Sequence, residues 1–437
     1  MNRGSAVVSR RRMTDRPWNA DRTAWRTGDR SARPVPSLME CGYYGLLCYA
    51  MLAPGLGILI PLAAGGMLLL LACFSVLHSG LSATVLSAPL RWPIACAASF
   101  LLIEVVFHGG SLADGVARPF VTWVLGLVVV HSLTRRPGFV HRCVLVLWVM
   151  GLTTVPYLIA RGPATDPTSQ RMAVDAEMIA GDFTNSNGLG GWFGFCAIYF
   201  TVVAVNAKKT RLLLGSCAAA LGCLYIVGLT VSRGGLLGTA LGMTIASRRI
   251  LKRGFVPVLL VVMLAGLTYY SGAFDDITSR YLARGAEDTG RLQVWPATLQ
   301  RFLDSPLLGV GADNVETYVP NSDRAIHPHN SFLWFAVASG VIPLVLFIGL
   351  WVRAARNAIA PEESPEAAFR APFLAHTFVN TMIGDLGFMQ PWGLVTLCLA
   401  LTRQPRPRTR RVFVPHRSPR TRRPLVLARA PISTPRI

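Results

Sequence analysis

The stretch NGLGGWFGFCAIYFTVVAVNA, residues 187–207, decides the fold class, because none of its side chains is charged. A helix of about 20 apolar residues is long enough to cross the hydrocarbon core of a bilayer. The polar run GDFTNS precedes this stretch at 181–186, and the basic run KKTR follows it at 208–211. Such a pattern is typical of a transmembrane helix with positive charge at one end.

Similar apolar windows recur along most of the chain. Of its 437 residues, 52% are hydrophobic and only 15% are charged, a balance that is unusual for a soluble domain. The windows lie near residues 42–57, 58–78, 91–109, 116–134, 139–160, 187–207, 211–231, 234–249, 255–273, 334–353, 370–384 and 390–402. The sequence therefore predicts an all-α integral membrane protein, with about 12 transmembrane helices within residues 41–402.

Two basic tails, residues 1–40 and 403–437, flank this membrane domain. They contain nine and eleven arginines, respectively, and their composition predicts disorder. Neither tail interleaves aromatic residues with its charges in a folded pattern, so a membrane surface is a better partner than nucleic acid. The remaining Lys and Arg residues concentrate in alternate connections between the windows. This pattern predicts a multi-pass protein of the cytoplasmic membrane with both termini in the cytoplasm.

The longest connection, residues 274–328, falls on the opposite side in this topology. It contains eight acidic residues against five arginines. Leu299, Phe302 and Leu303 recur at helical spacing, and Pro296 is suited to the first turn of that helix. We expect a large extracytoplasmic loop that contains short amphipathic helices.

Four polar segments are predicted on this outer face: GDFTNSNG at 181–188, VSRGG at 231–235, GRLQVW at 290–295 and IHPHNSFL at 326–333. The first could bind a ligand or cap the helix that starts near Asn187. In the second, Arg233 at a membrane boundary could snorkel, but the two glycines beside it favour approach of an anion. In the third, Arg291 could face a cleft or pair with the acids before it.

Histidine and arginine together indicate a group transfer from phosphate. Histidine is the side chain best suited to accept a proton near neutral pH. His327 and His329 could also ligate a metal, but no further ligand stands at a recognisable spacing. Arginine binds phosphate oxygens in a bidentate manner and stays charged, so it can hold a pyrophosphate leaving group without a divalent cation. These residue types suit transfer from a lipid pyrophosphate to a hydroxyl.

The order of these motifs resembles the O-antigen ligase and polymerase family of membrane glycosyltransferases, which includes protein O-oligosaccharyltransferases. The likeness runs from about residue 181 to 351. It rests on G-x-F-x-N-x-N-x-L at 181–189, S-R-G-G at 232–235, G-R-x-x-x-W at 290–295, D-S-P-L-L-G-V-G at 304–311 and H-N-S-F-L at 329–333. One departure is Ser186, where such proteins often have proline before the second Asn.

The resemblance implies a metal-independent transferase without a cofactor, which works in the assembly of envelope polysaccharide or exopolysaccharide. Its partners would be the bilayer, a glycan donor linked to undecaprenyl pyrophosphate, and a glycan, lipid or protein acceptor. Arg233 and Arg291 would hold the donor pyrophosphate, and His329 would deprotonate the acceptor, with His327 as the second candidate. Asn330 and Asp385 are candidates for orienting the catalytic groups, although Asp385 could equally cap a helix.

Three alternatives remain at this stage. A protein O-oligosaccharyltransferase would differ only in its acceptor. A polysaccharide or lipid transporter would place ionisable residues inside its helices, whereas Glu104, His78 and His131 lie towards the ends of theirs. A structural scaffold would leave the outer Arg and His segments without a role.

Overall fold

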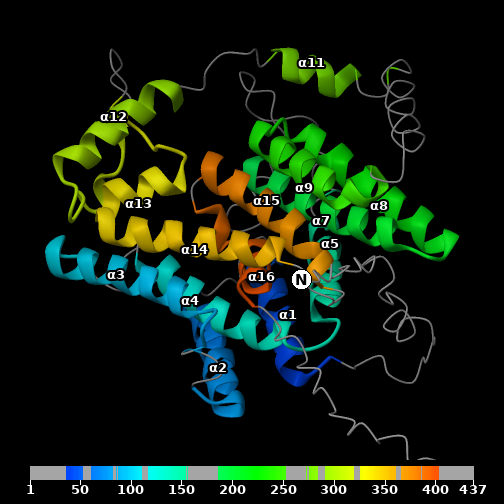
Figure 1. Cartoon of the computed structure of the whole chain (residues 1–437), viewed down its shortest axis with the longest axis horizontal. Helices are drawn as coiled ribbons and strands as arrows, with labels where there is room; N and C mark the ends of the chain where they lie inside the picture. The colour runs from blue at the N-terminus through cyan, green and yellow to red at the C-terminus, as the bar shows by residue number, and fades with distance from the viewer. Residues whose placement is uncertain are drawn as a thin grey trace, which may run out of the picture.

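The computed structural model is mostly helical (Figure 1). It describes residues 36–52, 61–81, 85, 87–110, 117–153, 155, 186–251, 272, 275–283, 291–318, 325–360, 366–384 and 386–402. The helices of the first half are α1 Leu38–Leu52, α2 Pro61–Ser79, α3 Arg91–Phe107, α4 Ala117–Thr134, α5 Phe139–Leu152, α7 Ser186–Asn206 and α8 Thr210–Leu229. The second half forms α9 Arg233–Leu251, α11 Asp275–Ala283, α12 Arg291–Asp304, α13 Ser331–Ser339, α14 Val341–Ile359, α15 Ala367–Ile383 and α16 Pro391–Leu401. The described part of the chain also contains two short 3-10 helices, η3 Ala312–Asn314 and η4 Gly387–Met389. Two antiparallel strands are present as well, β1 Thr317–Tyr318 and β2 Ala325–Ile326.

Four of the described helices are long and apolar enough to cross a membrane: α4, α7, α8 and α14. Shorter apolar helices form at three other predicted windows, within α2, α5 and α16. The predicted window 255–273 and both basic tails lie outside the described residues, apart from Gly272 and the segment 36–40. The structure therefore supports a helical membrane protein, and the number of 12 spans stays a prediction.

Helix α7 packs against α8, α9 and α15, and most of its side chains are buried. Its small residues allow this close approach. A side-chain carbon on Gly194 would lie 2.0 Å from Thr239 Oγ1 of α9 and 2.8 Å from His376 of α15. Small residues at helix contacts let backbones approach in membranes, where a hydrophobic driving force between helices is weak. The glycines within 187–207 are therefore packing positions.

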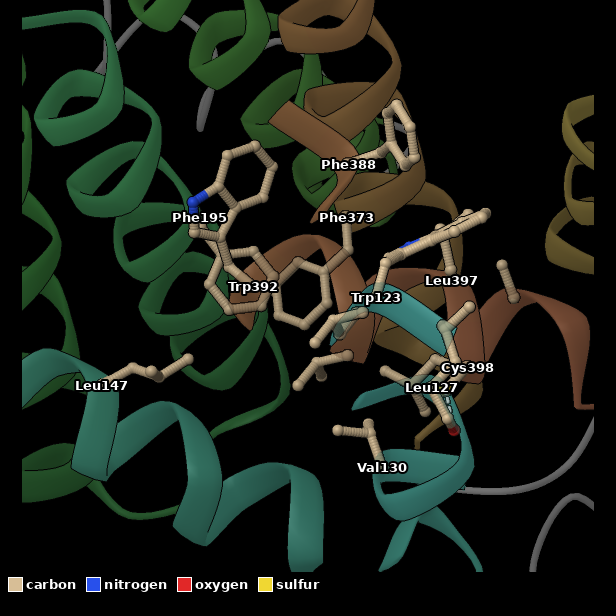
Figure 2. Close-up of a cluster of buried hydrophobic side chains, with 14 of the residues drawn as sticks. Trp123, Leu127, Val130, Leu147, Phe195, Phe373, Phe388, Trp392, Leu397 and Cys398 are labelled. Carbon is tan, nitrogen blue, oxygen red and sulfur yellow. Dashed lines mark hydrogen bonds between the residues drawn. The ribbon is translucent and has the colours of Figure 1, made fainter. Parts of the chain in front are cut away.

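A second core joins helices from both halves of the chain (Figure 2). Trp123 of α4 packs edge-on against Phe388 of η4, and Phe195 of α7 packs against Phe373 of α15. The Cys398 thiol of α16 points to the Leu127 carbonyl of α4. These contacts hold the ends of α15 and α16 in a fixed position against α4 and α7.

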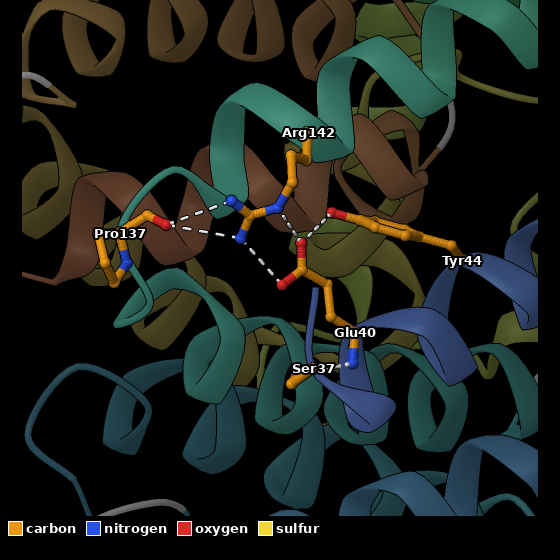
Figure 3. Close-up of polar contacts among 5 residues, drawn as sticks. All are labelled: Ser37, Glu40, Tyr44, Pro137 and Arg142. Atoms are coloured by element: carbon orange, nitrogen blue, oxygen red, sulfur yellow. Dashed lines mark hydrogen bonds and ion pairs between the residues drawn. The ribbon is translucent and has the colours of Figure 1, made fainter. Parts of the chain in front are cut away.

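Basic side chains lie at the ends of α4 and α14 and in the first turns of α5 and α15, among them Arg135, Arg356, Arg142 and Arg370. Arg142 of α5 forms a two-point ion pair with the buried Glu40 of α1, at 2.6 and 3.0 Å, and Tyr44 donates to the same carboxylate (Figure 3). Arg370 of α15 donates to the Thr402 carbonyl after α16. We call this the basic end of the bundle.

The predicted single helix over 334–353 is wrong. Two helices, α13 and α14, meet there at Gly340, whose φ of 78° lies in the left-handed region. The segment 304–311 wraps around this break, because Val310 N–H and Gly311 N–H donate to the last carbonyls of α13. A side-chain carbon on Gly340 would lie only 2.2 Å from the Leu307 carbonyl, so glycine is required at this contact.

The segment 274–328 contains α11, α12, η3 and β1. Helix α12 starts at Arg291, five residues earlier than Pro296, so the prediction of Pro296 in the first turn is wrong. Its apolar residues divide between two faces: Val294 is fully buried, whereas Leu299 and Leu303 are 47% and 57% exposed. An apolar face on a short amphipathic helix is suited to the surface of a membrane.

Candidate functional site

The tight turn between α8 and α9 places Arg233 as the first residue of α9. Ser232 caps this helix, since its hydroxyl accepts from Gly235 N–H at 3.1 Å. The same hydroxyl donates to Asn187 Oδ1 at 2.9 Å. The first and second predicted motifs are thus in direct contact, and Asn187 fixes the turn that presents Arg233.

The two glycines after Arg233 lie at close contacts between helices. The space beside Gly234 is filled by Ile383 of α15, and the space beside Gly235 by the backbone of Gly190 in α7. Helix packing thus occupies the side-chain positions of both glycines, and the approach of an anion to this turn stays a prediction. Arg233 itself is half-buried at the start of the helix.

Ile383 connects this turn to the fourth motif. It is the last residue of α15, and the next residue, Gly384, accepts from the Ser331 hydroxyl at 3.1 Å. The same hydroxyl accepts from Leu386 N–H, also at 3.1 Å. Ser331 is the first residue of α13, so the start of α13 and the end of α15 are joined by hydrogen bonds at both sides of Asp385.

Helix α12 meets the fourth motif through Trp295. The indole N–H of this residue donates to the Pro328 carbonyl at 2.8 Å. Pro328 stands between the two candidate histidines, and Trp295 lies one turn after Arg291. In Figure 1, α12 and α13 lie close together at the left of the view. The third and fourth motifs are thus also in direct contact.

Backbone strain is concentrated in these same segments. Among the described residues, three non-glycine residues have positive φ: Val231 at 49°, His329 at 46° and Leu386 at 50°. A left-handed conformation is uncommon for any L-residue and a true outlier for a β-branched one such as Val231. Each costs about 1–3 kcal/mol and persists only where the surrounding structure imposes it, often at functional sites.

The two histidines have different surroundings. His327 Nε2 lies 3.3 Å from the Glu316 carboxylate, which precedes β1. His329 is half-buried and directly precedes Asn330, the N-cap of α13. The Asn330 side chain accepts from Phe332 N–H at 2.9 Å and from Leu333 N–H at 3.2 Å. Asn330 thus fixes the start of α13 directly after His329.

The structure describes some of the predicted site residues only in part or not at all. For Arg291 it gives the position as the first residue of α12. Asp385 and residues 181–185 of the first motif lie outside the described residues. Within the described part of the chain, no group of three His, Cys, Asp or Glu side chains is arranged to hold a metal.

The sequence analysis missed one polar group close to this site. His376 is fully buried in the interior of α15, and its Nε2 lies 2.8 Å from the Gly191 carbonyl of α7. Asn380, one turn later, donates to the His376 carbonyl and lies beside Gly191 and Gly238. The sequence signal that could have revealed His376 is the presence of a histidine inside the predicted apolar window 370–384. Its contacts join α15 to α7, the helix whose Asn187 bonds to the turn that carries Arg233.

Comparison with known proteins agrees with these motifs. Residues 218–348 match the family model described as O-antigen ligase. Two curated relatives, from Rickettsia conorii and Rickettsia felis, bear the name "putative polysaccharide ligase". Each is 25% identical over 145 residues, which is 29% of this chain, and the match spans only 35% and 36% of their respective lengths. The segment 218–348, which contains Arg233, Arg291, His327 and His329, is thus a match to the O-antigen ligase family, as the motifs of the sequence indicate.

Proposed function

We propose that this protein is a membrane glycosyltransferase that moves a glycan from a polyprenyl pyrophosphate to an acceptor hydroxyl. The reaction takes place at the outer face of the cytoplasmic membrane, in the assembly of envelope polysaccharide. The chain needs no cofactor or metal for this step. Its substrates are a lipid-linked glycan donor and an acceptor glycan, lipid or protein.

One observation carries this proposal: the segments with the arginines and histidines are linked at the end of the bundle away from the basic end. The links run from Asn187 through the Arg233 turn to Ile383, Ser331 and Pro328, and from there to α12. Ser186 begins α7, whereas Asn206 ends it, and a helix of this length spans about 30 Å. Such a distance separates the two faces of a bilayer.

In the proposed step, the acceptor oxygen attacks the anomeric carbon of the donor sugar. The acceptor proton passes to the imidazole of His329. The bond between the anomeric carbon and the pyrophosphate oxygen breaks, and its electron pair stays with the polyprenyl pyrophosphate. Arg233 and Arg291 stabilise the negative charge that develops on this leaving group.

Asp385 and Asn330 have positioning roles in this proposal. Asn330 holds the start of α13, which fixes the backbone of His329. Asp385 stands in the sequence between two residues that bond to the Ser331 hydroxyl, and we assign to it the orientation of the imidazole. His327 is the second candidate for the base.

Deletion of the gene is expected to remove an envelope polysaccharide and to leave its lipid-linked precursor in the membrane. The physical reason is that the step that separates the glycan from its pyrophosphate would be missing. Mass analysis of extracted lipids and of envelope glycans measures both effects, and re-expression of the wild-type chain is the control. An unchanged glycan and an unchanged lipid pool would contradict the proposed function; loss of glycosylated protein alone would identify a protein acceptor.

A reporter enzyme that is active only outside the cytoplasm should be active when fused after Asp323. The same reporter should be inactive when fused after Lys208, at the connection between α7 and α8. The expected difference follows from the positive charge of that connection, which favours the cytoplasmic side. Activity in the opposite pattern would overturn the proposed orientation.

A further inference from the structure

A pocket of about 550 Å³ with both polar and apolar lining residues lies between α12, η3 and β1, within the size range of small-molecule sites. Its polar lining comes from all three elements: Gln300, Arg301, Asp313, Asn314, Glu316 and Tyr318. The elements are fastened to each other, because Arg301 donates to the Glu316 carbonyl and the Thr298 hydroxyl bonds to that of Thr317. The pocket is therefore part of the folded structure of the segment 274–328.

The lining has the chemistry of a saccharide site. Two carboxylates, two amides and one guanidinium offer planar donors and acceptors, which suit the adjacent hydroxyl groups of a sugar. Tyr318 is 68% exposed, so its ring has a free face against which a pyranose can pack. A phosphate ligand is disfavoured, because Asp313 and Glu316 outnumber Arg301.

The pocket adjoins His327, the second candidate for the base. Glu316 lines the pocket and also contacts His327, which is two residues from His329. Ala297, also in the lining, is two residues from Trp295, whose indole donates to the carbonyl between the two histidines. The turn that carries Arg233 contributes no residue to the pocket lining, and its contacts are with Asn187 and Ile383. A sugar in the pocket would thus approach from the side of the histidines.

From this arrangement we propose that the pocket binds the saccharide of the acceptor and directs its hydroxyl to His329. The proposal rests on the proposed glycan transfer and adds a place for the second substrate. It identifies Tyr318, Asp313 and Gln300 as residues that determine acceptor binding. Their exposure makes them replaceable without loss of the fold, since Asp313 and Tyr318 are exposed.

Binding can be measured without catalysis. Oligosaccharides released by mild acid from the cell's own envelope polysaccharide serve as the probe. They are added to the purified full-length chain in nanodiscs, and saturation-transfer NMR reports contact. We expect transfer to sugar protons for the wild type and for His329→Asn. Tyr318→Ala and Asp313→Asn should each weaken the Kd about tenfold, the effect of one lost contact to a charged or aromatic group.

Matched controls are Tyr225→Ala on the exposed face of α8 and Asp275→Asn at the exposed first residue of α11, neither of which lines the pocket. Both should bind as the wild type does. Equal binding by the wild type and the two pocket variants would overturn the proposal, as would the absence of any contact. These results do not depend on turnover, so they stand apart from a failure of the proposed function.

Steady-state kinetics show whether the sugar in the pocket belongs to the acceptor or to the donor. The pocket variants should raise KM for the acceptor about tenfold and leave KM for the lipid-linked donor unchanged. A raised KM for the donor alone would contradict the assignment and place the donor glycan in the pocket. If His329→Asn transfers glycan normally while the pocket variants lose binding, the proposed base fails and the saccharide site stands.

Discussion

Replacement of His329 by asparagine is expected to lower the rate of glycan transfer by a factor of about 10²–10⁴, the usual contribution of a positioned general base. Asparagine cannot accept the proton of the acceptor hydroxyl at neutral pH. It does tolerate the left-handed backbone that His329 adopts, with φ of 46°. The variant therefore changes the chemistry of the position and preserves its conformation better than His329→Ala does.

The matched control for this prediction is His327→Asn. His327 is bonded to Glu316 at the edge of the pocket, so we expect this variant to retain much more activity than His329→Asn. Rates are measured with the purified chain and lipid-linked glycan, after a check that both variants insert and purify in equal amounts. A larger loss of activity in His327→Asn than in His329→Asn would exchange the roles of the two histidines. Wild-type rates in both variants would remove both histidines from the mechanism.

Replacement of Arg233 by alanine is expected to lower transfer about 100-fold, because two charge-assisted hydrogen bonds to the leaving pyrophosphate would be lost. Arg233→Lys should recover only part of this loss, since lysine keeps the charge but not the two-point geometry. The helix itself should survive either change, because its cap is Ser232 rather than Arg233. The Arg291 variants should follow the same order of transfer activity, with Arg291→Lys more active than Arg291→Ala.

The control for the arginine series is Arg356→Ala, in the last turn of α14. This arginine belongs to the half of α14 farthest from Gly340, so its loss should leave transfer within about twofold of wild type. Initial rates at saturating and limiting donor concentrations give kcat and KM for each variant. Wild-type kinetics in Arg233→Ala would contradict its role at the pyrophosphate.

The positions of many helices followed from hydropathy, for a physical reason. The bilayer requires long uncharged segments, and residues such as those of α4, α7 and α8 satisfy this requirement by composition alone. The break at Gly340 did not follow from hydropathy, because both α13 and α14 are apolar. It depends on a left-handed glycine and on the segment 304–311, which bonds to the exposed carbonyls.

The contacts between the predicted site segments could not be predicted from the sequence, and the roles of the site residues stay predictions. Polar segments at the ends of apolar windows marked Arg233, Arg291 and His329. The bonds from Ser232 to Asn187 and from Trp295 to Pro328 join residues that are 45 and 33 positions apart in the chain. No periodicity encodes such pairs. For the same reason, neither the contact of His376 with the Gly191 carbonyl nor the pocket beside Glu316 could be predicted.

The central claim is that this chain itself transfers the glycan, with His329 and Arg233 at the reacting bond. The most direct measurement uses the purified chain in liposomes, with lipid-linked glycan extracted from the deletion strain and with a metal chelator present. Release of polyprenyl pyrophosphate and growth of the acceptor are followed together. We predict both for the wild type and neither, above the background rate, for the double variant His329→Asn with Arg233→Ala. Transfer by the double variant at the wild-type rate would contradict the account.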